Sequence, residues 1–143
     1  FEKTKPLYPF GYGLSYTTFS ISEPTLPTSE WDGSGKVHVE LDVKNTGERE
    51  GMETVQLYIR DVFSSVTRPV LELKGYKKVN LAPGEMKRMS FSLALDDFAF
   101  YDREMKYKAE KGDFNIFVGN SSNLYKLKKT TLELTKNIYI NEN

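Results

Sequence analysis

Apolar side chains alternate with polar ones in several short stretches of this chain. They occupy every second position of residues 37–43, 55–59, 89–95 and 114–118, and polar side chains stand at most positions between them. A repeat of two residues belongs to a β-strand with one buried and one solvated face, whereas an amphipathic helix repeats about every 3.6 residues. Antiparallel sheets show this alternation, while parallel strands are usually apolar on both faces. The chain is therefore predicted to be an all-β protein of antiparallel sheets.

Turn-forming residues separate these stretches. They stand at Asp32-Gly33, residues 45–51, Pro83-Gly84 and Gly112-Asp113. Proline presets φ and glycine accepts a positive φ, so Pro83-Gly84 predicts a type II turn. Further strands are expected over residues 18–23, 71–81 and 126–134. About seven short strands with this spacing of turns are typical of an immunoglobulin-like or fibronectin type III-like antiparallel β-sandwich.

The pattern divides the chain into three parts. Residues 1–16 are expected to form an aromatic linker, residues 17–136 the sandwich, and residues 137–143 a tail that frays. Residues 96–101 begin with two acids but are too short for more than one helical turn, so they are expected to cross between the sheets. Because the first residues contain neither a Met nor an apolar signal core, the chain is expected to be part of a longer protein.

Length and charge narrow the functions open to such a chain. Its 143 residues suit one domain with a single core. The 20 basic and 20 acidic side chains cancel, so neither nucleic acid nor a membrane is an expected partner. The chain contains no cysteine, which excludes a disulfide framework and a thiolate metal site. No stretch approaches the roughly 18 apolar residues of a transmembrane helix.

Catalytic chemistry has few candidates in this sequence. Glycosidic hydrolysis usually needs two facing carboxylates, but nearly all the acids lie on the solvated faces of predicted strands or in turns. The nearest acidic cluster, Asp96, Asp97 and Asp102, could ligate calcium, although helix-capping and turn roles suit these residues better. His38 is the only histidine and shares the solvated face with Glu40. The sequence therefore predicts no catalytic residue, no metal site and no cofactor.

Trp31 is the residue that suggests carbohydrate binding. It precedes Asp32-Gly33 and so lies beside a predicted loop, where an exposed indole can stack on a sugar ring. The alternative is an indole that packs against a sheet edge. Because 13% of the residues are aromatic, an independent carbohydrate-binding module with Trp31 in its site stays open.

Residues 6–19, PLYPFGYGLSYTTF, form the most unusual stretch of the chain. In an extended conformation its even positions place five large side chains on one side: Tyr8, Phe10, Tyr12, Leu14 and Tyr16. The prolines and glycines between them disfavour a central strand. A soluble monomer seldom exposes so much contiguous apolar surface. The segment therefore either folds back onto its own sandwich or docks on a neighbouring domain, and these residues alone leave both open.

The same stretch resembles the segment that leads into the C-terminal fibronectin type III-like domain of glycoside hydrolase family 3 enzymes, the β-glucosidases and β-xylosidases. The likeness continues in the same order through residues 43–47 (VKNTG), 55–58 (VQLY), 65–69 (SVTRP) with 72–76 (ELKGY), 81–85 (LAPGE) and 100–102 (FYD). The resemblance thus extends over nearly the whole chain.

This resemblance implies a structural role for the chain and the absence of catalytic residues from it. In that family the nucleophilic aspartate belongs to an N-terminal barrel and the acid/base residue to a following α/β domain, so no catalytic residue is carried over. The resemblance implies a non-catalytic structural module whose partners are the upstream catalytic domains of the same polypeptide. It also implies a periplasmic or extracellular location.

The main hypothesis is accordingly an inter-domain module. Its predicted contacts are the five even-numbered side chains of residues 8–16 and the loop 63–70, in which Arg68 is a fixed hydrogen-bond donor and Pro69 stiffens the chain. The rival hypothesis is the independent carbohydrate-binding module, whose partner would be a glycan.

Overall fold

The computed structural model describes residues 17–62, 71–120 and 126–140, and within these it contains eleven β-strands and one short 3-10 helix. The elements are β1 (Phe19–Ile21), β2 (Glu30–Trp31), β3 (Val37–Asn45), β4 (Gly51–Asp61), β5 (Glu72–Leu81), β6 (Met86–Leu93), η2 (Leu95–Phe98), β7 (Phe100–Tyr101), β8 (Tyr107–Ala109), β9 (Gly112–Asn120), β10 (Lys128–Leu134) and β11 (Ile138–Tyr139). All seven strands that the sequence predicts are present. The four that it does not predict, β2, β7, β8 and β11, have two or three residues each.

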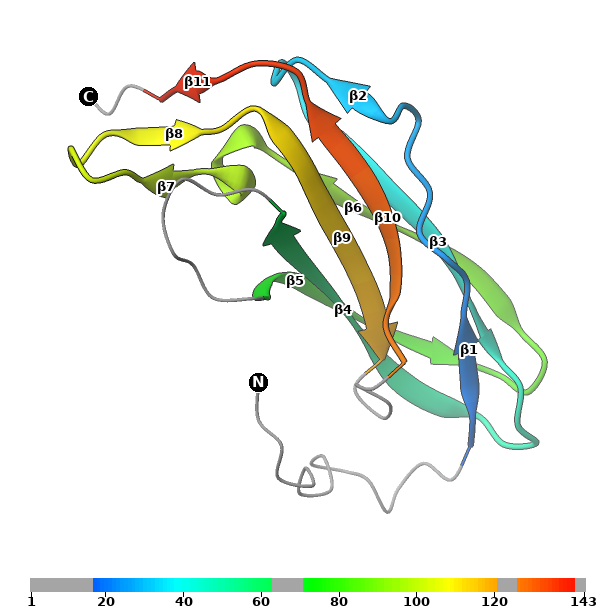
Figure 1. The fold of residues 1–143 in the computed structure, drawn as a ribbon. Helices are drawn as coiled ribbons and strands as arrows, with labels where there is room; N and C mark the ends of the chain where they lie inside the picture. The colour runs from blue at the N-terminus through cyan, green and yellow to red at the C-terminus, as the bar shows by residue number, and fades with distance from the viewer. Residues whose placement is uncertain (1–16, 63–70, 121–125, 141–143) are drawn as a thin grey trace.

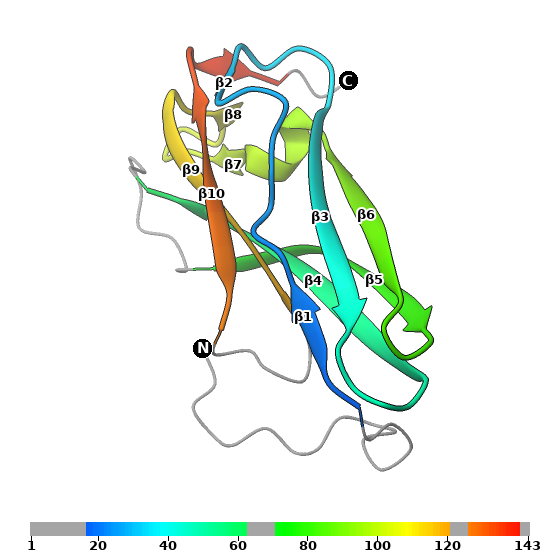
Figure 2. The ribbon, with the colours of Figure 1, turned by 90° about the vertical axis from the view of Figure 1, so that its right-hand side faces the viewer.

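Two sheets form the layers of a sandwich, as Figure 2 shows from the side. One sheet has three strands in the order β1-β3-β6, and the other has five in the order β2-β10-β9-β4-β5. The ladders between the long strands are antiparallel, as predicted. The short pair of β2 with β10 is parallel and is an exception to that prediction. The fold is thus the predicted antiparallel β-sandwich.

The core lies between the two sheets and follows the alternation of the sequence. In β3 the odd-numbered residues from Val37 to Asn45 are buried, while His38 and Glu40 are exposed on the other face. The odd-numbered residues of β4 are buried in the same way up to Ile59. Burying such branched side chains stabilises the fold by roughly 1.5–3 kcal/mol each. The alternation of apolar and polar residues therefore determines which face of each sheet is buried.

The turn between β5 and β6 has the geometry that Pro83-Gly84 predicts. Gly84 has φ +78°, in the region that glycine adopts without steric cost. The amide of Glu85 donates to the carbonyl oxygen of Ala82 at 3.0 Å, which closes the turn. A second hydrogen bond, from the amide of Gly84 to the carbonyl oxygen of Asn45 at 2.9 Å, ties this turn to the end of β3.

The predicted single helical turn is the 3-10 helix η2, which leads from β6 into a third, small sheet. This sheet has the order β11-β8-β7 and lies at one end of the sandwich (Figure 1). The carboxylate of Asp97 accepts a hydrogen bond from the amide of Ala94 at 2.9 Å, which caps the start of the turn. The expectation of a capped turn is confirmed, and the turn joins the sandwich to the small sheet.

The structure differs from the prediction for the C-terminal tail. Residues 137–143 are expected to fray, but Ile138 and Tyr139 pair with Ala109 and Lys108 as strand β11. Ile138 also packs against the core and lies so close to Gly33 that a Cβ on that glycine would collide with it. Residues 138–140 are held because two apolar side chains, Ile138 and Ile140, pack against the core, and the amide of Ile140 donates to the carbonyl oxygen of Tyr107 at 2.8 Å. Two alternate apolar residues are too short a pattern to predict a strand.

Candidate functional site

The predicted aromatic linker joins the sandwich at Thr17, which contacts the turn between β3 and β4. The hydroxyl of Thr17 donates a hydrogen bond to Oδ1 of Asn45 at 2.8 Å. The amide of Thr46 donates to the carbonyl oxygen of Thr18 at 2.8 Å, and the hydroxyls of Thr18 and Thr46 lie 2.7 Å apart. These contacts hold Thr17 and Thr18 against the turn between β3 and β4. We call residues 17, 18 and 45–47 the junction.

Asn45 is the centre of the junction and is fully buried, with 0% of its surface exposed. Besides the hydroxyl of Thr17, its Oδ1 accepts the amide of Gly47 at 2.9 Å. Its Nδ2 donates to the carbonyl oxygens of Arg49 at 2.7 Å and of Leu81 at 3.0 Å. The side-chain amide therefore uses both donor hydrogens and both acceptor sites, which a buried asparagine requires. Asn45 thus connects Thr17, the β3–β4 turn and the end of β5.

Gly47 allows Thr17 and Thr18 to approach the turn this closely. A Cβ on Gly47 would collide with the Thr17 hydroxyl and would lie 2.9 Å from the amide nitrogen of Thr18. Any larger residue would push residues 17 and 18 away from the turn. The sequence pattern marks Asn45 to Gly47 only as a turn, so it misses their role in holding Thr17 and Thr18. The aromatic segment before Thr17 is the signal that could have pointed to it.

The predicted inter-domain contacts fall outside the described part of the chain. Tyr8, Phe10, Tyr12, Leu14 and Tyr16 belong to residues 1–16, and Arg68 and Pro69 belong to residues 63–70. What the structure does place is the chain on either side of them. Residues 63–70 connect β4 to β5, and the preceding amide, that of Val62, donates to the carbonyl oxygen of Asp113 at 3.1 Å.

Trp31 does not present an open aromatic face. Its side chain is buried, with 8% of its surface exposed, and its Nε1 donates to the carbonyl oxygen of Ser34 at 2.7 Å. Its ring lies 5.3 Å from that of Phe98, which in turn packs edge-on against Phe114 at 5.0 Å. Pairing of β2 with β10 draws the indole into the core. The carbohydrate-binding role suggested for Trp31 therefore loses the exposed ring on which it depends, and the packing alternative describes this residue.

The acidic cluster has the structural roles that the sequence favours. Asp102 accepts hydrogen bonds from the amides of Glu104 at 2.8 Å and Lys106 at 2.9 Å and so closes the β7–β8 turn. The hydrogen bond from the Lys106 amide is the main cause that holds the pKa of Asp102 below its ordinary value, and the nearby Lys108 also lowers this pKa. Within residues 17–62, 71–120 and 126–140 no three His, Cys, Asp or Glu side chains gather in a way that could hold a metal ion.

Glu53 departs from the pattern of solvated acids. It shares the inward face of β4 with Val55 and is buried, and its Oε1 accepts the amide of Thr54 at 2.9 Å. No other acid in the described ranges is classed as buried. Its odd position in β4 is the sequence signal that could have predicted this burial.

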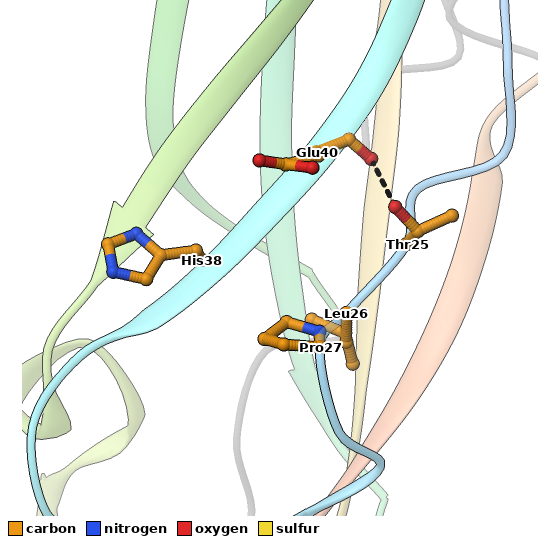
Figure 3. A pocket seen from close by; sticks show the side chains of 5 residues that line it. All are labelled: Thr25, Leu26, Pro27, His38 and Glu40. Atoms are coloured by element: carbon orange, nitrogen blue, oxygen red, sulfur yellow. Dashed lines mark hydrogen bonds between the residues drawn. The ribbon is translucent and has the colours of Figure 1, made fainter.

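One shallow pocket of about 330 Å³ opens on the solvated face of the three-stranded sheet (Figure 3). It is lined by Thr25, Leu26, Pro27, His38 and Glu40. The Glu40 carboxylate is held by Arg88 at 3.0 Å, and Nδ1 of His38 lies 3.1 Å from the hydroxyl of Ser92. Glu40 is the one acid among the lining residues, whereas glycosidic hydrolysis usually uses two. The pocket therefore lacks the carboxylate pair of a glycosidase.

Comparison with known proteins assigns this sandwich to a class. Residues 53–122 match the family described as the fibronectin type III-like domain. The matched segment includes most of β4 together with β5, β6 and β9, which supply strands to both layers. The chain therefore carries a fibronectin type III-like domain.

The relatives that it matches are glycosidases. A periplasmic β-glucosidase of Salmonella typhimurium is 49% identical over 121 residues, which are 85% of this chain and 16% of that protein. Thermostable β-glucosidase B of Acetivibrio thermocellus is 41% identical over 143 residues, covering 96% of this chain and 19% of that protein. The solved structure of a β-glucosidase from Erythrobacter marinus superimposes with a TM-score of 0.80 at 39% identity, over 94% of this chain and 18% of that one.

The chain thus spans less than a fifth of the length of these relatives. It is a non-catalytic fibronectin type III-like module that corresponds to a small part of β-glucosidases and β-xylosidases. The short helix η2, the one helix in the described ranges, is not long and apolar enough to cross a membrane.

Proposed function

We propose that this chain is the C-terminal structural and inter-domain module of a glycoside hydrolase family 3 enzyme, of the β-glucosidase or β-xylosidase type, that hydrolyses O-glycosyl bonds. One observation carries the proposal. Between 85% and 96% of the chain matches the first relatives, yet it accounts for only 16% to 19% of their length. The catalytic groups of the whole protein therefore lie in domains other than this one.

In this role the module is held to the catalytic domains by the aromatic linker and the loop 63–70. The even-numbered side chains from Tyr8 to Tyr16 supply the apolar contact, and Arg68 with Pro69 adds a second point of contact. The junction supports this arrangement because Asn45 and Gly47 fix Thr17 against the sandwich. A linker that leaves a rigid anchor transmits the orientation of one domain to the next, whereas a flexible one does not.

Hydrogen exchange tests this proposal. Amide exchange is measured on the 143-residue chain and on the longer protein that contains it, and the largest difference is expected at residues 6–19. Equal protection of these residues in both proteins contradicts the docking role. The longer protein is expected to hydrolyse nitrophenyl β-glucoside or β-xyloside, and the 143-residue chain is expected to hydrolyse neither. Hydrolysis by the chain alone would contradict a non-catalytic module.

The location of the whole protein is part of the same proposal. We place it in the periplasm or outside the cell, supported by the relative from Salmonella typhimurium, which is named as periplasmic. Cell fractionation of the source organism, with the longer protein detected by antibody against this chain, tests the location. Recovery with the cytoplasmic fraction alone contradicts it.

A further inference from the structure

The outer face of the five-stranded sheet carries a row of apolar side chains. The register places Tyr58 of β4 directly opposite Leu73 of β5 on one side and Phe117 of β9 on the other. In the next row Tyr76 of β5 lies opposite Gln56. Residues directly opposite each other in a ladder project from the same face. Three aromatic rings and a leucine are thus gathered on the side of this sheet that faces away from the core.

Two of these apolar side chains expose half or more of their surface to solvent. Tyr76 is 63% exposed and Leu73 is 50% exposed, while Tyr58 and Phe117 are half-buried. The outer face of the three-stranded sheet in the same molecule is different. Its strands β3 and β6 present mostly polar side chains in the corresponding rows, namely His38, Glu40, Asp42 and Lys44, and Arg88, Ser90 and Ser92. Met86, opposite Lys44 at the end of this face and 60% exposed, is the single apolar side chain among them, and no Phe, Tyr or Trp ring lies in these rows. The apolar row is therefore a property of one face and not of the fold.

Cationic side chains surround the apolar row. Arg60 lies opposite Asn115 beyond Tyr58, Lys78 lies opposite Thr54 beyond Tyr76, and Lys129 lies opposite Phe117. The acids on this face, Asp113, Glu133 and Glu30, lie in one row at its far end, where Glu133 is opposite both of the others. An aromatic centre with a charged border is the arrangement of a protein interface, in which the border excludes water from the central contacts. Because charges across an interface are usually complementary, a partner of this positive border is expected to carry carboxylates.

The position of this face in the chain indicates which partner it meets. Arg60 and Leu73 stand on either side of residues 63–70, the loop that carries Arg68 and Pro69. The two strands that carry Tyr58 and Leu73 are therefore the ones that flank this proposed docking loop in the sequence. The chain also covers only 16% to 19% of the length of its relatives. In the proposed longer protein, most of the residues that this face could meet therefore lie in other domains.

We infer that the outer face of the five-stranded sheet, centred on Tyr58, Leu73, Tyr76 and Phe117, docks on the rest of the same polypeptide, against an apolar surface bordered by carboxylates. This inference rests on the proposed inter-domain function and names the face that serves it. A glycan is a weaker occupant, because branched Leu73 has no ring for a sugar to stack on and yet lies in the same row as Tyr58.

The structure offers a matched pair of tyrosines for the test. Tyr76→Asp in the longer protein places a charge in the centre of the proposed interface, while Tyr139→Asp changes a side chain that is 56% exposed on β11, in the small sheet. Lys78→Glu and Lys44→Glu form a second pair, since Lys44 is exposed on the outer face of the other sheet. Melting of the 143-residue chain with each substitution checks that all four variants fold.

Hydrogen exchange at residues 54–60 and 72–78 is the main readout. These amides are expected to exchange about tenfold more slowly in the longer protein than in the chain, and Tyr76→Asp should remove most of the difference because central aromatic residues dominate interfaces. Lys78→Glu should remove part of it. Tyr139→Asp and Lys44→Glu should leave it unchanged.

The possible outcomes separate this inference from the proposed function. If residues 6–19 are protected in the longer protein but residues 54–60 and 72–78 are not, the inference is wrong and the proposed function stands. Equal protection of all these residues in chain and longer protein overturns both. Equal effects of Tyr76→Asp and Tyr139→Asp also overturn the inference. Heat released on titrating the chain with cello- or xylo-oligosaccharide, and lost in Tyr76→Asp, assigns the face to a glycan instead.

Discussion

The hydroxyl of Thr17 donates a hydrogen bond to Oδ1 of Asn45 at 2.8 Å, across 28 positions of the sequence. This contact links the residue that follows the aromatic linker to a side chain that is fully buried at the end of β3. Because the remaining hydrogen-bonding groups of Asn45 bind the β3–β4 turn and the end of β5, the position of Thr17 depends on the folded sandwich.

Replacing Asn45 by alanine is expected to destabilise the chain by at least about 2 kcal/mol. The substitution leaves the amide of Gly47 and the carbonyl oxygen of Leu81 without their partner, and each buried unsatisfied group costs about 1–3 kcal/mol. Urea unfolding of the 143-residue chain measures the change. Asn80→Ala is the control, because Asn80 is exposed and its hydrogen bond to Glu50 lies at the surface, so it should cost about 0.5 kcal/mol or less. Equal losses in the two variants would contradict the role of Asn45.

Gly47→Ala should detach the linker from the turn. The new Cβ collides with the Thr17 hydroxyl and crowds the amide of Thr18, and such crowding costs about 1–3 kcal/mol. Hydrogen exchange should rise at residues 17–19 before it rises elsewhere. Gly75→Ala is the matched control, since its Cβ would lie 3.5 Å from the nearest atom of Phe91, an ordinary contact distance. If exchange at residues 17–19 rises no more in Gly47→Ala than in Gly75→Ala, Gly47 is not needed to hold Thr17 and Thr18 against the turn.

Trp31 should behave as a core side chain in fluorescence and stability. It is the only tryptophan, so its emission reports one site, and burial against Phe98 predicts a blue-shifted spectrum that acrylamide quenches weakly. Trp31→Ala is expected to cost about 3–5 kcal/mol, as for other large buried aromatics. Cello- and xylo-oligosaccharides should leave the emission unchanged. A shift on adding sugar would restore the carbohydrate-binding hypothesis for this residue.

The β7–β8 turn should weaken in acid. The pKa of Asp102 is lower in the folded chain than its ordinary value of 3.8, chiefly through the hydrogen bond from the Lys106 amide. A lowered folded pKa means that this carboxylate stabilises the fold fully above its unfolded pKa and that the contribution is lost as pH falls through the folded pKa.

Melting temperatures of the chain and of Asp102→Asn between about pH 5 and pH 2 measure this contribution. Asparagine can still accept the amides of Glu104 and Lys106 but does not titrate, so the two melting curves should converge as pH falls. A constant difference between them over this range would show that the charge of Asp102 does not contribute.

The predictions that hold are those that depend on local pattern. Alternation in residues 37–43 places Val39 in the core and His38 in solvent, and both positions are confirmed. Pro83-Gly84 predicts its turn because φ preferences belong to single residues. Asp97 and Asp102 are found in capping and turn roles for the same reason, since both accept hydrogen bonds from amides two to four positions away.

What the sequence left open or predicted wrongly depends on contacts between distant parts of the chain. For Trp31 the sequence left open an exposed ring beside a loop or a ring packed against the protein, and the ring packs against Phe98, the buried residue of η2. Ile138 belongs to a tail by composition and becomes part of β11 because it finds Ala109 and the core. The sequence around Trp31 does not indicate its contact with Phe98, and the sequence around Ile138 does not indicate its pairing with Ala109.

By itself the sequence determined the class of fold, the inward face of each long strand and the kinship of the module, because periodicity and turn preferences act over a few residues. Only the tertiary structure decided that Asn45 receives Thr17, that Trp31 is covered, and that Tyr58, Leu73 and Phe117 form one row on an outer face. Those relations depend on the register between strands. Register is set by the packing of the whole sandwich, since a slip of one residue would turn every side chain of a strand to its other face.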